Sequence, residues 1–159
     1  MVSDGEVLRL PVIPARGGSK RIPRKNIKAF HGKPIMAYSI EAARNSGLFD
    51  EVMVSTDDEE IALIAERYGA SVPFFRSAET SGDHATTANV LLEVLENYRQ
   101  IERKFFHICC IYPTAPFITG EKLQKAFALL EESGADALVP VVAFSYPPLR
   151  GLTIHDDRL

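Results

Sequence analysis

The segment 14–26 carries the residues of this chain that are best suited to chemistry. It reads Pro-Ala-Arg-Gly-Gly-Ser-Lys-Arg-Ile-Pro-Arg-Lys-Asn and holds five cations and no acid. Gly17, Gly18 and Ser19 allow a sharp turn that aims consecutive backbone N–H groups into one concavity, which suits an anion. Cations on both sides of this turn would neutralise a polyphosphate. The segment, called the basic loop from here on, therefore predicts an anion-binding site.

Two common phosphate-binding motifs do not fit the basic loop. A P-loop needs Gly-Lys-Ser/Thr at the start of a helix, and Pro23 interrupts any helix at that place. A dinucleotide fingerprint needs a third glycine at the helix start, and none is found there. No helix pattern begins before Ile35, and loops of roughly 20 residues inside compact domains are usually functional. An ordinary solvated loop is the alternative interpretation.

The charge of the chain is unevenly distributed. Its 159 residues include 18 Lys and Arg against 21 Asp and Glu, a formal net charge of −3. Residues 16–28 hold six of these cations and no acid, so the rest of the chain has a balance of −9. A small positive region on an acidic body favours a small anionic ligand over nucleic acid, which needs a broad basic face.

Composition indicates a globular protein without a membrane segment. The chain is 46% hydrophobic and 25% charged, as globular domains usually are. It has no apolar run near 18 residues and no signal peptide, so we expect a cytoplasmic location and no membrane partner. Cys109 and Cys110 would point to opposite faces of a strand, which favours buried small hydrophobes over a redox or metal pair. We expect the first six residues to be disordered.

Strand and helix patterns alternate along the chain with short links. The expected strands span residues 7–13, 51–55, 71–75, 105–112 and 137–142. The expected helices span residues 35–45, 58–68, 86–100 and 119–132, with Thr56 or Asp57 as the cap of the second. This alternation predicts an α/β fold, a three-layer α/β/α sandwich around a mostly parallel, Rossmann-like sheet. We expect residues 1–143 to form one nucleotide-binding domain.

The fold class also predicts where the site lies. In parallel α/β sheets, ligands bind beyond the carboxyl ends of the strands. That edge would collect the basic loop, the strand end at 55–57, the polar loop 76–87 and the turn at 112–114. Four unusual stretches would thus converge on one site.

Several of these stretches resemble the signature of the acylneuraminate cytidylyltransferases. The matching residues are segment 14–20, Pro23, Lys25, Asn26, Val-Ser-Thr-Asp at 54–57, Arg76 and Tyr-Pro-Thr-Ala-Pro at 112–116. The resemblance covers about residues 7–142 and implies the nucleotide-diphospho-sugar transferase fold. It also implies transfer of CMP from CTP to a nine-carbon sialic-type sugar acid. Segments 24–26, 83–84 and 112–117 look most like the branch that uses pseudaminic acid, in bacterial flagellin glycosylation.

The resemblance implies roles for individual residues. Arg16 and Lys25 would be catalytic, holding the CTP phosphates, with Lys25 stabilising charge at the α-phosphate. The implied nucleotide-binding residues are Ala15, Arg16, Gly17, Gly18, Ser19, Lys25, Asn26, Arg76, Ala85 and Thr87. Cations suit these roles because phosphoryl-type transfer depends mainly on positioning and electrostatics.

Tyr112 and Thr114 are the implied sugar-binding residues. Tyr112 stands where many sialic acid enzymes have glutamine, which favours a different nine-carbon acid. It also ends an apolar strand, so a place in the core is the alternative. We interpret Asp57 as a helix cap rather than a metal ligand, and Asp83 could serve only to stabilise its loop.

Mg²⁺ is the cofactor that the resemblance implies, held in the family by an Asp-x-Asp pair. We expect that pair beyond Leu159 and assign no metal ligand within the chain. Residues 144–159 look like the start of a truncated dimerisation arm. We therefore expect a homodimer for the intact protein, and nucleotide binding with little turnover for these 159 residues.

Two other functions remain open. A sugar-1-phosphate nucleotidyltransferase would favour another nucleotide and a phosphorylated sugar. A non-catalytic nucleotide- or RNA-binding module is also compatible with the basic loop, although aromatic residues do not interleave with its cations as a stacking surface requires.

Overall fold

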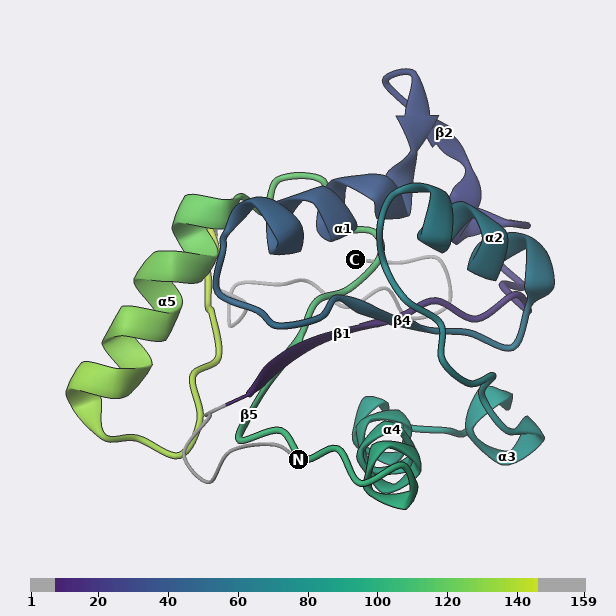
Figure 1. Ribbon diagram of the computed structural model, residues 1–159. Coiled ribbons are helices and arrows are strands. Elements are labelled where there is room, and N and C mark those ends of the chain that lie inside the picture. The colour runs from purple at the N-terminus through teal and green to yellow at the C-terminus, as the bar shows by residue number, and fades with distance from the viewer. Residues whose placement is uncertain (1–7, 146–159) are drawn as a thin grey trace, which may run out of the picture.

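The chain forms three layers, with a parallel sheet between two layers of helices. The computed structural model describes residues 8–145, and Figure 1 shows helices above and below the central strands. The α/β/α sandwich predicted from the sequence is therefore confirmed. The predictions for the first six residues, and for the arm beyond residue 145, fall outside the described residues.

The sheet has three described strands in the order β4-β1-β5. Strand β1 (Arg9–Pro14) lies in the middle, between β4 (Met53–Ser55) and β5 (His107–Cys110), and both neighbours run parallel to it. The chain passes from β1 to β4 on one side and only later to β5 on the other. This reversal of strand order makes the carboxyl end of β1 the switch point of the sheet, where α/β proteins bind ligands.

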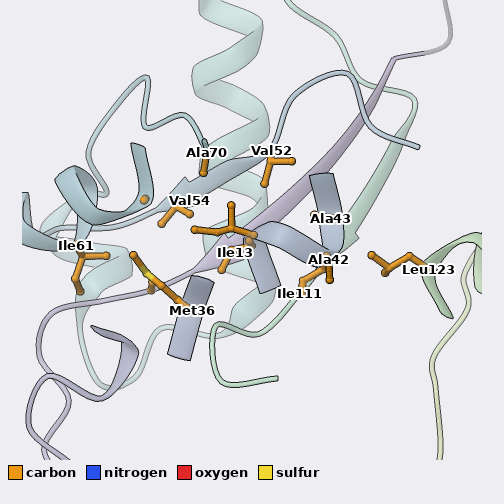
Figure 2. Packing of buried hydrophobic residues seen from close by; sticks show 13 residues of the cluster. Ile13, Met36, Ala42, Ala43, Val52, Val54, Ile61, Ala70, Ile111 and Leu123 are labelled. Atoms are coloured by element: carbon orange, nitrogen blue, oxygen red, sulfur yellow. The ribbon is translucent and has the colours of Figure 1, made fainter. Parts of the chain in front are cut away.

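Helices α1 (Ile35–Asn45), α2 (Glu59–Arg67) and α5 (Gly120–Ser133) cover one face of the sheet. Figure 2 shows Ile13 and Val54 of the sheet packed among the apolar side chains of this layer. Alanines on α1 let that helix approach the strands closely. This is the larger of the two cores, and its buried residues run from Ile13 to Leu123, so it joins β1 and β4 to helices from both halves of the chain.

Helix α4 (Thr87–Gln100) covers the opposite face. Its Val94 and Tyr98 pack against Leu10 and Val12 of β1, and all four side chains are almost fully buried. Since successive strand residues point to opposite faces, Leu10 and Val12 enter this core while Ile13 enters the other. The unbroken apolar run of β1 is thus explained by burial on both sides.

Helix ends follow local sequence chemistry. Asp58, Ser77, Thr86 and Thr119 are the N-caps of α2, α3 (Ala78–Ser81), α4 and α5, each accepting a hydrogen bond from a backbone N–H. The predicted cap of the second helix, Thr56 or Asp57, is wrong by one or two positions. Asp58 caps instead, because its carboxylate reaches Ile61 N at 3.0 Å.

The expected strand at 71–75 is reduced to a single parallel bridge between Met53 and Ser71. Ser71 N donates to Val52 O, and Val54 N donates to Ser71 O. The ladder then stops because Pro73 has no N–H to donate. The segment rejoins the sheet region at Arg76, whose backbone N–H donates to Thr56 O at 2.8 Å.

The expected strand at 137–142 is also wrong. These residues have no strand assignment, and Val139, Val141 and Val142 are 77–91% exposed. A β-branched pattern fits a strand only where a neighbouring strand offers hydrogen-bond partners and a face to pack on. Within residues 8–145 the sheet ends at β5, and residues 137–142 pair with no strand of that sheet.

The basic loop leads into structure that the sequence did not indicate. It ends in a short 3₁₀ turn, η1 (Lys25–Ile27), followed by the hairpin β2 (Ala29–Phe30) and β3 (Lys33–Pro34). His31 and Gly32 both have positive φ, as two-residue hairpin turns require. In the part of the chain that is described, no helix is long and apolar enough to cross a membrane.

Candidate active site

A cleft of about 800 Å³ opens at the carboxyl end of β1. Its lining residues come from three stretches of the chain, 14–26, 76–90 and 112–114. These are three of the four stretches expected to converge, so that part of the prediction is confirmed. The fourth, 55–57, lies behind the lining and holds it in place through Ser55 and Asp57.

Arg16 lies at the centre of the polar contacts on one side of the cleft. Its Nη1 donates to the carbonyl oxygens of Gly82, at 3.0 Å, and Ser81, at 3.3 Å. The same nitrogen is 3.1 Å from Asp83 Oδ1. Lys20 forms an ion pair with the other oxygen of Asp83. The basic loop is thereby tied to the segment that follows α3.

Other groups of the basic loop attach it to the start of α2. Gly17 N donates to Asp57 Oδ1 at 2.8 Å, and Arg24 pairs with Asp58 and Glu60. A Cβ at Gly17 would stand 2.6 Å from Asp58 Oδ2, so any larger residue would force the Asp58 side chain to shift. The hydrogen bond from Arg24 lowers the pKa of Asp58, outweighing the effect of burial. This carboxylate is therefore ionised while it caps the helix.

Lys25 and Asn26 lie where the loop turns back towards the sheet. Both line the cleft, and no ion pair within residues 8–145 involves Lys25. Asn26 is buried and donates through Nδ2 to Arg16 O at 3.0 Å. Its Oδ1 is also buried but has no hydrogen-bond partner among the described residues. Buried polar atoms are normally paired, so this oxygen fits a donor group of a ligand.

Arg76 enters the cleft from the opposite side. Its Nε donates to Ser55 Oγ at 3.0 Å, and its Nη2 to Ser55 O at 2.6 Å, which fixes the guanidinium against the end of β4. Burial lowers the pKa of Arg76, and the nearby Asp57 and Glu93 carboxylates oppose this effect. An arginine remains charged under such shifts, so Arg76 is a fixed positive group at the cleft.

Tyr112 lies at the far end of the cleft, just beyond β5. Its side chain is 59% exposed, so the alternative that placed it in the core is wrong. The backbone oxygen accepts from the buried Ser39 Oγ at 2.8 Å, and the phenol oxygen is 3.1 Å from Thr87 Oγ1. Thr114 lines the same region. These contacts hold the phenol over the cleft from two elements.

Most of the predicted site residues line the cleft. They are Arg16, Ser19, Lys25, Asn26, Arg76, Ala85, Thr87, Tyr112 and Thr114. Ala15, Gly17 and Gly18 are not among the lining residues; Ala15 is fully buried in the larger core, and its N–H donates to Ser55 O. Lys20 and Asp83 line the cleft although neither was assigned a role there. The charge of the basic loop could have indicated Lys20, but only the fold brings Asp83 to it.

No metal centre is formed by the described part of the chain. Within residues 8–145 there is no group of three or more His, Cys, Asp or Glu side chains that could hold a metal ion. Asp57 is used by Gly17, and Asp83 by two cations. Cys109 and Cys110 are free and half-buried rather than fully buried as expected, and desolvation raises the pKa of Cys109 to about 11, which disfavours its reactive thiolate form.

Fold and cleft together define an α/β protein with a cleft lined by basic residues at the switch point of a parallel sheet. Residues 10–146 match a family described as cytidylyltransferase, and the chain belongs to that family.

Two relatives and one solved structure illustrate the similarity. The chain is 44% identical, over 94% of its length, to pseudaminic acid cytidylyltransferase from Campylobacter jejuni. It is 37% identical, over 87% of its length, to the CMP-N,N'-diacetyllegionaminic acid synthase of Legionella pneumophila. The structure of a CMP:2-keto-3-deoxy-manno-octonic acid synthetase complexed with CTP matches 80% of the chain with a TM-score of 0.67 and 23% identity. That structural match shows a shared fold.

The chain spans only part of each of these proteins. It covers 64% of the Campylobacter relative, 60% of the Legionella relative and 49% of the solved structure.

Proposed function

We propose that this protein transfers CMP from CTP to a nine-carbon sugar acid, with pseudaminic acid as the favoured acceptor, and releases pyrophosphate. The main support for this proposal is the basic cleft at the end of β1, which is built from the stretches that show the family resemblance. The 44% identity to a pseudaminic acid cytidylyltransferase supports the choice of acceptor.

The proposed reaction is a displacement at phosphorus. A hydroxyl oxygen of the sugar acid attacks the α-phosphorus of CTP and loses its proton. The bond from that phosphorus to the bridging oxygen breaks, and pyrophosphate leaves with the electron pair. Negative charge gathers on the phosphate oxygens, so preorganised cations supply most of the catalysis in reactions of this kind.

Arg16 and Lys25 are the proposed catalytic residues because both line the cleft from the basic loop. Lys25 would stabilise charge at the α-phosphate, and Arg16 would hold the departing phosphates. Asn26 Oδ1, which has no partner among the described residues, would accept a hydrogen bond from the nucleotide.

Arg76, Ala85 and Thr87 are proposed to form the pocket for the cytosine and ribose. The guanidinium of Arg76 is already fixed by Ser55, so little side-chain freedom remains to be lost on binding. Tyr112 and Thr114, at the other end of the cleft, would face the sugar acid.

Mg²⁺ is part of the proposal although the described residues do not form a site for it. Magnesium in nucleotide sites usually has one or two carboxylate ligands and takes most of its other ligands from phosphates and water. Mg²⁺ would therefore enter the cleft bound to the triphosphate.

We further propose that the active protein is a homodimer in the cytoplasm.

Thermal unfolding in the presence of nucleotides tests the proposal. A ligand that binds the native state raises the unfolding temperature, and at a given concentration it does so more the tighter it binds. With Mg²⁺ present, CTP is expected to raise that temperature more than UTP, GTP or dTTP at the same concentration. Pyrophosphate release by a full-length version, from CTP with pseudaminic, legionaminic or sialic acid, then identifies the acceptor.

The possible outcomes separate the proposed function from its alternatives. Equal shifts with all four nucleotides contradict selection of cytosine. Preference for another nucleotide, with turnover of a sugar 1-phosphate, indicates a sugar-1-phosphate nucleotidyltransferase. Steeply salt-dependent RNA binding without a CTP effect indicates a binding module.

A further inference from the structure

Asp83 lies between two cations of the basic loop. One carboxylate oxygen is 3.1 Å from Arg16 Nη1, and the other pairs with Lys20 Nζ. All three residues line the cleft. A carboxylate that offers one oxygen to each of two cations resembles a phosphate group, which also offers negatively charged oxygens as acceptors to such cations.

The exposure of the Lys20 and Asp83 side chains argues against an ion pair that serves only to stabilise the fold. The side chain of Lys20 is 79% exposed, and that of Asp83 is 41% exposed. Exposed ion pairs contribute little to stability, because solvent screens them and ordering long side chains costs entropy. Stability alone therefore gives little reason to place a carboxylate here.

A second carboxylate accepts a hydrogen bond from another donor of the basic loop, one that could otherwise bind an anion. Asp57 Oδ1 accepts the backbone N–H of Gly17 at 2.8 Å. The glycine turn was expected to offer such N–H groups to an anion. Two independent donor groups of the basic loop are thus satisfied by the protein's own carboxylates.

We propose that Asp83 stands in for a phosphate group in the nucleotide-free protein, and that a bound polyphosphate displaces it from Arg16 and Lys20. This inference rests on the proposed function and adds Asp83 as an internal competitor for the cations of the basic loop.

The ionisation of Asp83 is consistent with this competition. The hydrogen bond and charge of Lys20, and the nearby Arg16, lower the pKa of the Asp83 carboxyl. The group is therefore negative throughout the neutral range, where nucleotides are also highly charged. Replacing Asp83 with a neutral residue removes this competing carboxylate but leaves Arg16 and Lys20 in place.

Binding of inorganic tripolyphosphate to the Asp83→Asn variant tests the inference by calorimetry. The dissociation constant is expected to fall by about threefold relative to the unaltered protein, the scale of one exposed charge pair. The matched control is Glu79→Gln, which removes the same charge from exposed α3 without touching the cleft lining. Its dissociation constant should change less than that of Asp83→Asn.

Unchanged or weaker binding by Asp83→Asn would overturn the inference, as would an equal effect of Glu79→Gln. So would the absence of tripolyphosphate binding to either protein. Lys20→Gln in the otherwise unaltered chain gives a second test that does not depend on the folding of Asp83→Asn. It should weaken tripolyphosphate binding about threefold, and an unchanged constant overturns the assignment of Lys20.

The same experiment with CTP and UTP keeps this inference apart from the proposed function. If Asp83→Asn tightens tripolyphosphate binding but CTP is not preferred over UTP, the proposed function fails while the competition by Asp83 stands. If CTP is preferred but Asp83→Asn has no effect, only the competition by Asp83 fails.

Discussion

The cations of the basic loop differ in whether they form ion pairs with acidic side chains of the protein. Arg24 is bound to the acidic start of α2, and Arg16 and Lys20 are bound to the segment after α3. Lys25 lines the cleft and forms no ion pair within residues 8–145. A cation at the cleft that forms no ion pair with the described residues is well placed to meet the charge that develops on a substrate.

In a full-length version of the protein, replacing Lys25 with alanine is expected to reduce transferase turnover more than tenfold, since losing one charge-stabilising group costs a few kcal/mol of barrier. CTP binding should weaken by a smaller factor, because the other cations remain. Pyrophosphate release and calorimetry measure the two effects.

The matched control is Lys28→Ala, a neighbouring exposed lysine that does not line the cleft. An active Lys25→Ala protein would remove Lys25 from the mechanism.

At the scale of elements, helix α4 positions the short helix α3. Glu93 on α4 accepts from the backbone N–H of Ser77 at 2.8 Å and from the hydroxyl of Thr80. Burial raises the pKa of Glu93, but these hydrogen bonds lower it by more, so the carboxylate is ionised. A four-residue helix is not stable by itself. Glu93 therefore holds in place the carbonyl oxygens that orient Arg16.

We expect Glu93→Ala to raise the dissociation constant for CTP severalfold while the fold survives, because loss of the acceptor frees Ser77 and Thr80 and loosens the contacts to Arg16. Glu93→Gln keeps one acceptor oxygen and should restore part of the affinity. Calorimetry gives the constants, and circular dichroism checks that the protein is folded.

Glu96→Ala is the control, because Glu96 is exposed on the same helix and, within residues 8–145, forms an ion pair only with Arg99. Equal CTP affinity of Glu93→Ala and the unaltered protein would show that α3 needs no such support.

At the scale of the whole molecule, the end of the sheet opposite the cleft is held by a network around Glu51. Its carboxylate accepts from Tyr98 Oη at 2.7 Å and also binds Ser71 and Arg103. Burial raises the pKa of Glu51, but these three partners lower it by more, so the net change is downward from 4.5. The network joins the start of β4 to α4 and to the segment before β5.

Glu51→Gln is expected to lower the free energy of unfolding at pH 7 by about 1–3 kcal/mol, because the donors of Ser71, Tyr98 and Arg103 are left without a charged acceptor. A carboxyl group with a lowered native pKa stabilises the fold above its ordinary pKa and loses that effect as pH falls through the native value. The difference between the two proteins should therefore shrink as pH drops below about 4.5.

Urea unfolding at several pH values measures this difference. Glu66→Gln, at an exposed position of α2, serves as the control and should change stability little at any pH. A gap that stays constant down to pH 3 would contradict the role of Glu51.

The amino-acid sequence by itself determined the layers, the four longer helices and the place of the site, but it did not indicate the four-residue helix α3. Helix ends were predictable to within a few residues because caps such as Thr119 act locally. The cleft was predictable because the carboxyl ends of parallel strands meet at one edge, whatever the packing details.

The tertiary structure alone decided which patterns became strands and which charges met. Residues 137–142 have a strand-like pattern, but no strand lies beside them among residues 8–145, and Pro73 ends the ladder at Ser71. Asp83 lies 63 residues from Lys20 in sequence, so no local pattern could pair them. Hydrogen bonds of a sheet and ion pairs of a cleft are made between distant segments, and their partners exist only once the chain has folded.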